Sequence, residues 1–436
     1  MATEDMVVAF VAALQASGSV LLTIWYGLVA GQIGFLDNHT AKKMSKMGVD
    51  MLLPALLITN LGSQLHLDTA SRYIPILIWS LIYNFASIAI GLVATRLFNL
   101  PKWVTPALAF NNTTSLPLLL VQSLSSTGAL SQILQSPDDT TSEALDRARS
   151  YLLVSSIVGN SLTFGLGGEL LGAHDEDARD ELEKSLRQGS GETSETEEGN
   201  NNNNNDEEEE ADEETSLLPR PIVAYRSRVS RSAYTAASNL WDKTPHALQT
   251  FTAHVVRFIS PPIFGAAIGM ALGLAPPLHR LFFNDPTDGG YFKAWLTSSV
   301  KNLGELFVAL QVIVVGAKLA HGLRRMRRGE QAGRLPGVAV TFVLFVRFVM
   351  WPVISILAIT YIARNGTLGD DPVLWFTMML MPTGPPAMKL TALAEATHAD
   401  DEEKMAITKF LSISYALSPV ITPTIMMGLK ACKVWI

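Results

Sequence analysis

The sequence carries little charge and almost no cysteine. Charged residues make up 17% of its 436 residues, and Cys432 is the single cysteine, whereas roughly a quarter of the residues in an ordinary soluble protein are charged. One cysteine excludes an internal disulfide framework and a metal site built from cysteines. The net charge of −7 comes mostly from one acidic segment, so it does not indicate a nucleic-acid partner.

The motifs that membrane enzymes and ATP-driven pumps need are also missing. The sequence contains no glycine-rich phosphate-binding loop, no pair of histidines at metal-ligand spacing and no convincing nucleophile–base pair. We therefore predict no catalytic residue, no metal and no cofactor.

Long apolar runs dominate what is present. Hydrophobic residues make up 48% of the chain and the mean hydropathy is +0.25, and a helix needs about 20 apolar residues to cross a bilayer. The candidate spans are residues 8–35, 43–66, 72–98, 104–126, 148–171, 250–275, 298–321, 335–362, 372–394 and 405–430. We predict an all-α integral membrane protein with ten transmembrane helices. The acidic N-terminus and the long first run favour a retained helix over a cleaved signal peptide.

The spans form two membrane parts, residues 1–171 and 250–436, joined by the acidic segment 172–249. In this segment Asn200–Asn205 is directly followed by Asp206–Glu210. Such low hydrophobicity and high charge are typical of a disordered chain. Its serine-containing basic end favours contact with anionic lipid, and regulation by phosphorylation stays open.

The lysines and arginines of the short loops predict the orientation, because cytosolic loops are enriched in them. With the N-terminus outside, ten of these residues lie on the cytosolic side and six on the opposite side. Both termini are then lumenal or extracellular, and the segment 172–249 is cytosolic.

The two membrane parts look related to each other. Gly27–Gly34 in the first span and Gly265–Gly273 in the sixth both place small residues four apart, which permits close helix packing. Five spans per part force the two parts into opposite orientations, so we predict two inverted five-helix repeats, as in many secondary transporters.

The fourth and ninth spans are interrupted in corresponding places. The fourth contains Asn111–Ser115 and Pro117, and the ninth contains Pro382–Pro386. Irregular backbone at membrane depth is tolerated only inside protein or along a watery cavity. Paired interruptions of this kind mark binding sites in transporters, where the free N–H groups of half-helices suit an anion. Simple proline kinks packed against neighbours are the alternative.

This pattern gives a set of candidate substrate contacts in the two interrupted spans. They are Asn111, Asn112, Thr113, Ser115, Pro117, Thr383, Gly384, Pro385, Pro386 and Lys389. For Lys389 two interpretations stay open, a contact to an anionic substrate and a structural pairing with a carboxylate such as Glu395.

Arg347 lies in the middle of the eighth span, where an isolated charge is costly. It therefore needs a partner, and Asp50 in the second span and Glu305 in the seventh are the candidates. An ion pair of the scaffold is favoured over a substrate contact.

Three motifs resemble the auxin efflux carrier family, and within it the PIN-LIKES branch more than the PIN-FORMED branch. They are Lys46-Met47 with Leu52–Leu57, Asn112-Thr113 with Ser115–Leu118, and Gly384–Met388. The resemblance covers both membrane parts and leaves out the acidic segment.

The resemblance implies ten helices in two inverted repeats, with helices 4 and 9 crossing at Pro117 and Pro385. It implies an elevator mechanism, in which helices 3–5 and 8–10 slide against helices 1, 2, 6 and 7. It also implies indole-3-acetic acid or a similar amphipathic organic anion as substrate, Asn112 in the substrate site, a homodimer and a place in the endoplasmic reticulum.

The sequence departs from the family pattern at two places. Lys389 stands where relatives often have Asn, and Asn111–Ser115 stands where they often have Gly-Asn-Thr-Gly-Asn. Both changes argue against auxin itself as the physiological substrate. The Asn- and Glu-rich segment is typical of a fungal member.

The leading hypothesis is a secondary carrier or facilitator that exports or sequesters a small amphipathic organic anion. One alternative is proton- or sodium-coupled transport, as in bile-acid carriers and sodium–proton exchangers. Another is a membrane receptor or scaffold that binds a ligand without moving it. The endoplasmic reticulum is the expected membrane, with the plasma membrane second.

Overall fold

Regular structure is helical throughout the part of the chain that the computed structural model describes, apart from one isolated β-bridge. That part comprises residues 2–66, 70–136, 138–171, 260–327, 335–396 and 401–433. The all-α prediction is confirmed for these residues. The acidic segment 172–249 lies outside them, so its disorder and its regulation stay predictions.

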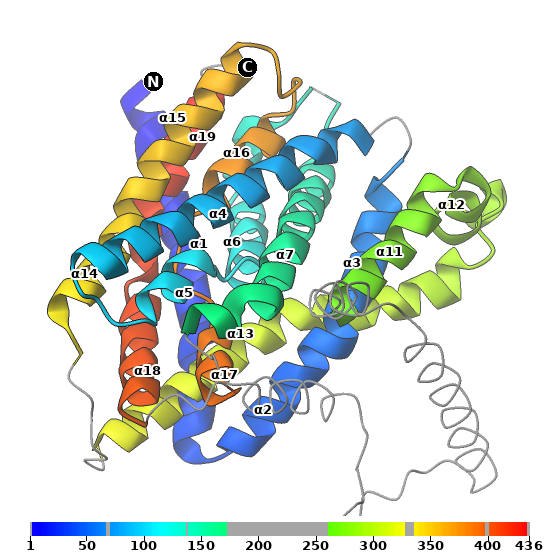
Figure 1. Cartoon of the computed structure of the whole chain (residues 1–436). Helices are drawn as coiled ribbons and strands as arrows, with labels where there is room; N and C mark the ends of the chain where they lie inside the picture. The colour runs from blue at the N-terminus through cyan, green and yellow to red at the C-terminus, as the bar shows by residue number, and fades with distance from the viewer. Residues whose placement is uncertain are drawn as a thin grey trace, which may run out of the picture. The chain divides into compact units, whose positions relative to one another are not determined.

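Figure 1 shows the helices in chain order. The first membrane part contains α1 (Ala2–Ile33), α2 (Asn38–Met47), the π-helix η1 (Gly48–Leu52), α3 (Leu53–Gln64), the 3₁₀ turn η2 (Ala70–Tyr73), α4 (Ile74–Leu97), α5 (Val104–Ala109), α6 (Ser115–Ser126), the 3₁₀ turn η3 (Leu130–Ile133) and α7 (Thr141–Leu171). The second contains α11 (Pro261–Leu274), α12 (Pro276–Phe283), the 3₁₀ turn η4 (Pro286–Asp288), the π-helix η5 (Lys293–Thr297), α13 (Ser298–Arg327), α14 (Gly337–Phe345), the π-helix η6 (Val346–Met350), α15 (Trp351–Arg364), α16 (Pro372–Leu380), α17 (Lys389–Ala396), α18 (Asp401–Ala416), the 3₁₀ turn η7 (Ser418–Ile421) and α19 (Thr422–Lys433).

Four described segments are long and apolar enough to cross a membrane as single helices: 10–33, 70–97, 293–325 and 337–364. Two further pairs qualify if each counts as one bent span: α11 with α12, bent by 102°, and α18 with α19, bent by 52°. The expected fourth and ninth spans are each divided into two short helices. The described residues thus contain four to six candidate spans, and the ten-helix arrangement stays a prediction.

The interrupted helices lie in the interior. Every residue of α5 and of α16 is buried. In contrast, α4 exposes large apolar side chains, among them Ile78, Ile82 and Phe85. An exposed apolar face of this size is expected to contact lipid in an integral membrane protein.

Glycines allow two pairs of helices to pack unusually closely. On α1, a Cβ atom added to Gly27 would lie 2.0 Å from the backbone oxygen of Ile313 on α13. On α11, a Cβ atom at Gly269 would lie 2.9 Å from the backbone oxygen of Leu57 on α3. The predicted close packing at both glycine motifs is confirmed, and it joins the first helix to α13 and α11 to α3.

Gly27→Ala is expected to lower the midpoint of thermal unfolding of the purified protein by several degrees. The added methyl group clashes with backbone that cannot move away, and overpacking of this kind costs about 1–3 kcal/mol. Gly18→Ala on the same helix is the matched control, because a Cβ atom there meets nothing within 4 Å. Alanine also favours the helix by about 1 kcal/mol over glycine, so Gly18→Ala should be neutral or stabilising. Equal unfolding midpoints for the two variants would contradict the packing account.

Candidate functional site

The two interrupted helices meet at their interruptions. We call the connecting segments, residues 110–114 between α5 and α6 and residues 381–388 between α16 and α17, the crossover. Asn111 and Pro386 form an isolated antiparallel β-bridge. The amide of Asn112 donates to the carbonyl oxygen of Pro385 at 3.2 Å, and the amide of Ala387 donates to that of Phe110 at 2.8 Å. The chain therefore satisfies backbone groups that neither helix can satisfy alone.

The local sequence explains why both helices stop here. Gly384 has φ +94°, a left-handed conformation that glycine adopts at no steric cost. Pro385 and Pro386 have no N–H to continue a helix. Pro117 differs from the prediction, because it lies in the first turn of α6, where a missing N–H costs little. The segment between α5 and α6 therefore crosses the segment between α16 and α17 at Asn111 and Asn112 and not at Pro117.

The side chains of the two adjacent asparagines form hydrogen bonds with different parts of the protein. Asn111 is buried, and its Nδ2 donates to the carbonyl oxygen of Met381 at 2.8 Å. Asn112 donates from Nδ2 to Ser115 Oγ and to Tyr415 Oη, both at 3.1 Å. Ser115 Oγ in turn donates to Asn112 Oδ1 at 3.1 Å. Asn111 thus fastens the crossover, whereas Asn112 is held at its surface.

A small cavity lies against the crossover on the side of α1. Its lining residues are Ser17, Val20, Asn112, Leu116, Pro117, Leu120, Leu380, Thr383, Gly384, Pro385, Ser418 and Ile421. Most are apolar, and the polar ones are an asparagine and three hydroxyl side chains. The cavity volume is about 30 Å³, which leaves room for water. The site is therefore too small for an organic substrate in this conformation.

The cavity includes half of the ten predicted substrate contacts: Asn112, Pro117, Thr383, Gly384 and Pro385. The other five do not line it. Asn111 and Pro386 hold the crossover together, and Ser115 positions Asn112. The buried Thr113 lies against Gly159 of α7.

The helix ends at the crossover differ in how their partial charges are compensated. At the C-terminal end of α5, the carbonyl oxygen of Phe110 accepts from Ala387 and from Arg347. At the end of α16, the carbonyl oxygen of Met381 accepts from Asn111. The N-terminus of α6 has no side-chain cap, so its free N–H groups and partial positive charge remain available to an anion.

Lys389 does not line the cavity. It is the first residue of α17, half-buried, and its Nζ donates to Oδ1 of Asn160 on α7. This contact ties α17 to α7 on another side of the crossover.

The predicted pairing of Arg347 with Asp50 or Glu305 is wrong. Both carboxylates lie at exposed positions, and Glu305 pairs with Lys301 on its own helix at 3.9 Å. Arg347 instead points into the interior, where its Nη2 donates to the carbonyl oxygen of Phe110 at 3.3 Å. Burial of a carboxylate costs solvation free energy. Asp50 and Glu305 therefore stay at exposed positions and do not reach Arg347.

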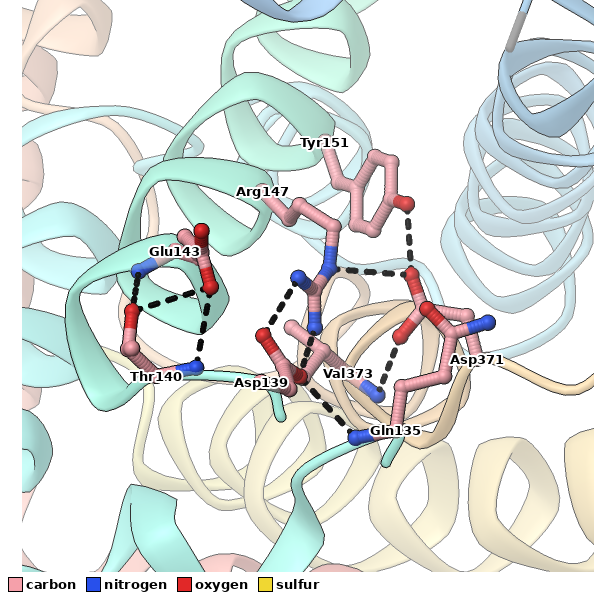
Figure 2. A network of polar contacts seen from close by, with 8 residues as sticks. All are labelled: Gln135, Asp139, Thr140, Glu143, Arg147, Tyr151, Asp371 and Val373. Atoms are coloured by element: carbon pink, nitrogen blue, oxygen red, sulfur yellow. Dashed lines mark hydrogen bonds and ion pairs between the residues drawn. The ribbon is translucent and has the colours of Figure 1, made fainter. Parts of the chain in front are cut away.

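A second polar network, outside the cavity, ties α7 to the start of α16 (Figure 2). Arg147 donates to both carboxylate oxygens of Asp139, at 2.9 and 2.5 Å, and its Nε lies 3.4 Å from Oδ2 of Asp371. Tyr151 donates to the same oxygen of Asp371 at 2.7 Å, and Asp371 Oδ1 accepts from the amide of Val373 at 3.1 Å. Asp371 thus caps α16 and binds α7.

Tyr415 and Asp371 were missed by the sequence reasoning. Tyr415 stands three residues before Ser418-Pro419, a breaker pair that marks the bend between α18 and α19, and this pair was an available signal. Asp371 directly precedes Pro372 at the start of α16, the usual place of an N-cap carboxylate.

Comparison with known proteins gives relatives for nearly the whole chain. A family model described as "Membrane transport protein" matches residues 14–426. An uncharacterized transporter of Schizosaccharomyces pombe is 25% identical over 422 residues, which cover 93% of this chain and 91% of the relative. An uncharacterized transporter of Saccharomyces cerevisiae is 24% identical over 86% of each chain. Protein PIN-LIKES 5 of Arabidopsis thaliana is 25% identical over 40% of this chain and 41% of its own length.

Asp139→Asn is expected to lower the thermal unfolding midpoint at neutral pH, with a difference from the natural protein that disappears in acid. The hydrogen bonds from Arg147 hold the pKa of Asp139 below its ordinary value of 3.8. A carboxylate with a lowered pKa stabilises the fold above about pH 4, and the contribution is lost as the pH falls through the folded-state pKa. Melting curves between pH 7 and pH 3 measure the difference. A constant difference across that range would contradict the assignment.

Proposed function

This chain belongs to the membrane transport protein family, and from that premise we propose that it is a secondary carrier for a small amphipathic organic anion. The family includes the auxin efflux carriers, and relatives include fungal transporters and plant PIN-LIKES proteins. The observation that carries the proposal is the cavity at the crossover, which joins an apolar lining to an uncapped helix N-terminus.

The lining supports the substrate class. Val20, Leu116, Leu120, Leu380 and Ile421 would contact an apolar ring. The N–H groups at the start of α6 would bind a carboxylate, because helix N-termini stabilise anions. The Asn112 amide would add a hydrogen bond by giving up its bond to Ser115 or to Tyr415. An apolar pocket with few well-placed polar groups is typical of small-molecule sites. Indole-3-acetic acid has this character and is the probe of choice.

The size of the cavity supports alternating access. A volume of about 30 Å³ is far below the roughly 300 Å³ or more of pockets that hold drug-sized ligands. The cavity must therefore open for a substrate to enter, and this conformation corresponds to a closed carrier.

The packing supports ten helices in two inverted repeats. If the two repeats are equivalent, each contact between two helices must have a counterpart, formed by the corresponding helices of the opposite repeats. The contact of α1 with α13 then corresponds to that of α11 with α3, and both depend on glycine. The contact of α4 with α5 corresponds to that of α15 with α16. That of α6 with α7 corresponds to that of α17 with α18.

The position of the cavity supports an elevator mechanism. Ser17 and Val20 come from α1, which belongs to the proposed scaffold of α1–α3 and α11–α13. The other lining residues come from the proposed mobile bundle of α4–α7 and α14–α19. The crossover and the Asp371 network lie wholly within the bundle. A bond between Ser17 Oγ and Thr422 Oγ1, at 3.0 Å, joins α1 to the bundle. A sliding bundle would carry the crossover along α1.

The remaining features of the proposal follow from the family and the sequence. The carrier would sit in the endoplasmic reticulum as a homodimer, with both termini lumenal and the segment 172–249 cytosolic, and it would bind no nucleic acid. Coupling to Na⁺ or H⁺ is the alternative. The crossover segments contain no Asp or Glu to bind a coupling ion, and the buried Asp371 is paired with Arg147 and Tyr151. These observations favour uniport.

Purified protein in proteoliposomes is expected to take up labelled indole-3-acetate without any ion gradient. Asn112→Ala should lower uptake at subsaturating substrate by about 10- to 100-fold, because hydrogen bonds to charged groups are worth about 1.5–3 kcal/mol. Pro385→Ala should also lower it, since it frees the backbone at the crossover. Asn60→Ala is the matched control, because the Asn60 amide bonds only to its own helix.

Three results of this experiment contradict parts of the proposal. Binding of indole-3-acetate without uptake would exclude a carrier and favour a receptor. Uptake that requires a sodium or proton gradient would exclude uniport. Equal uptake by Asn112→Ala and Asn60→Ala would exclude the crossover cavity as the site.

A further inference from the structure

Arg347 is a fully buried cation in the core of the protein. It lies in the π-helix η6 between α14 and α15, and its exposed fraction is 1%. Such π-helical turns within α-helices occur frequently at functional sites. Its cost of burial is large unless something compensates its charge.

No acidic side chain in the described residues forms an ion pair with Arg347. Its Nη2 donates to the carbonyl oxygen of Phe110 at 3.3 Å, and its Nε is buried without a hydrogen-bond partner. The ionisable groups that interact with it are the phenols of Tyr83 and Tyr415. A carbonyl dipole compensates only part of a full charge, so the site keeps a net positive charge.

This charge lies next to the cavity without lining it. Phe110 directly precedes Asn111 and Asn112 in the crossover, and Tyr415 accepts a hydrogen bond from Asn112 at 3.1 Å. Arg347 thus bonds to Phe110, two residues before the lining residue Asn112, and interacts electrostatically with Tyr415, to which Asn112 donates. A low-dielectric interior transmits the field of such a charge over several ångströms.

We propose that Arg347 is the positioning residue that makes the crossover cavity selective for anions. Its fixed positive charge is compensated when a carboxylate enters the cavity, so the protein favours a charged substrate over a neutral one of the same shape. The inference rests on the proposed function, because it assumes that the crossover cavity is the substrate site. A carrier coupled to Na⁺ or H⁺ would need to bind a cation at this site. Arg347 supplies a permanent positive charge there instead.

The test compares the affinities of the full-length protein in nanodiscs for indole-3-acetate and for its neutral analogue indole-3-acetamide. A unit charge about 10 Å from an anion changes its affinity by about tenfold at an effective dielectric constant of about 20. Arg347→Gln and Arg347→Met should therefore reduce the acid-to-amide affinity ratio about tenfold, whereas loss of a purely structural contact would lower both affinities by the same factor. Arg347→Lys should keep the ratio. Arg96→Gln is the matched control, because Arg96 is an exposed cation at the end of α4.

The outcomes separate this inference from the proposed function. If the natural protein prefers the acid and Arg347→Gln and Arg347→Met keep that ratio, the inference is wrong while the carrier proposal stands. An equal loss of acid and amide affinity would indicate a purely structural role and also overturn it. Loss of the ratio in Arg347→Lys would exclude the charge as the cause. If the natural protein binds neither probe, the proposed function fails first.

Discussion

The structure depends on one constraint, which is that backbone polar groups deep in an apolar interior must find partners. Two helices stop there, and their broken ends satisfy each other through the bonds of Asn112 to Pro385 and of Ala387 to Phe110. Side chains complete the task, since Asn111 bonds to Met381 and Arg347 to Phe110. These bonds occupy the carbonyl ends of α5 and α16, whereas the N-terminus of α6, beside the cavity, has no side-chain cap.

The helices around the crossover are held in two different ways. Glycine contacts bring α1 against α13 and α11 against α3, which suits a rigid scaffold because packed backbone has little freedom to shift. The helices of the proposed mobile bundle are joined by polar bonds, among them those of Arg147 with Asp139 and Asp371. The cavity lies where these two groups of helices meet. In the proposed carrier, a shift between them would open it without breaking either group.

The sequence contained enough to predict the interruptions and the glycine contacts, because proline, glycine and small-residue spacing act locally. Asn112 and Pro385 were predicted as site residues and line the cavity. The different hydrogen-bond partners of the Asn111 and Asn112 side chains could not be predicted, because both residues lie in one irregular segment without helical periodicity. The partner of Arg347 was wrongly predicted, because charge pairing suggested a carboxylate where the fold supplies a carbonyl. Tyr415 was missed because its role depends on contacts between α18 and the distant crossover.

In the proposed carrier, the bundle slides along α1 to move the substrate, and a cross-link between α1 and the bundle tests this motion most directly. Ser17 and Thr422 are hydrogen-bonded across this boundary at 3.0 Å, and the single natural cysteine, Cys432, is buried. Oxidation of the Ser17→Cys, Thr422→Cys double variant should stop uptake of indole-3-acetate in proteoliposomes, and reduction should restore it. Uptake that continues at full rate in the cross-linked protein would contradict the account.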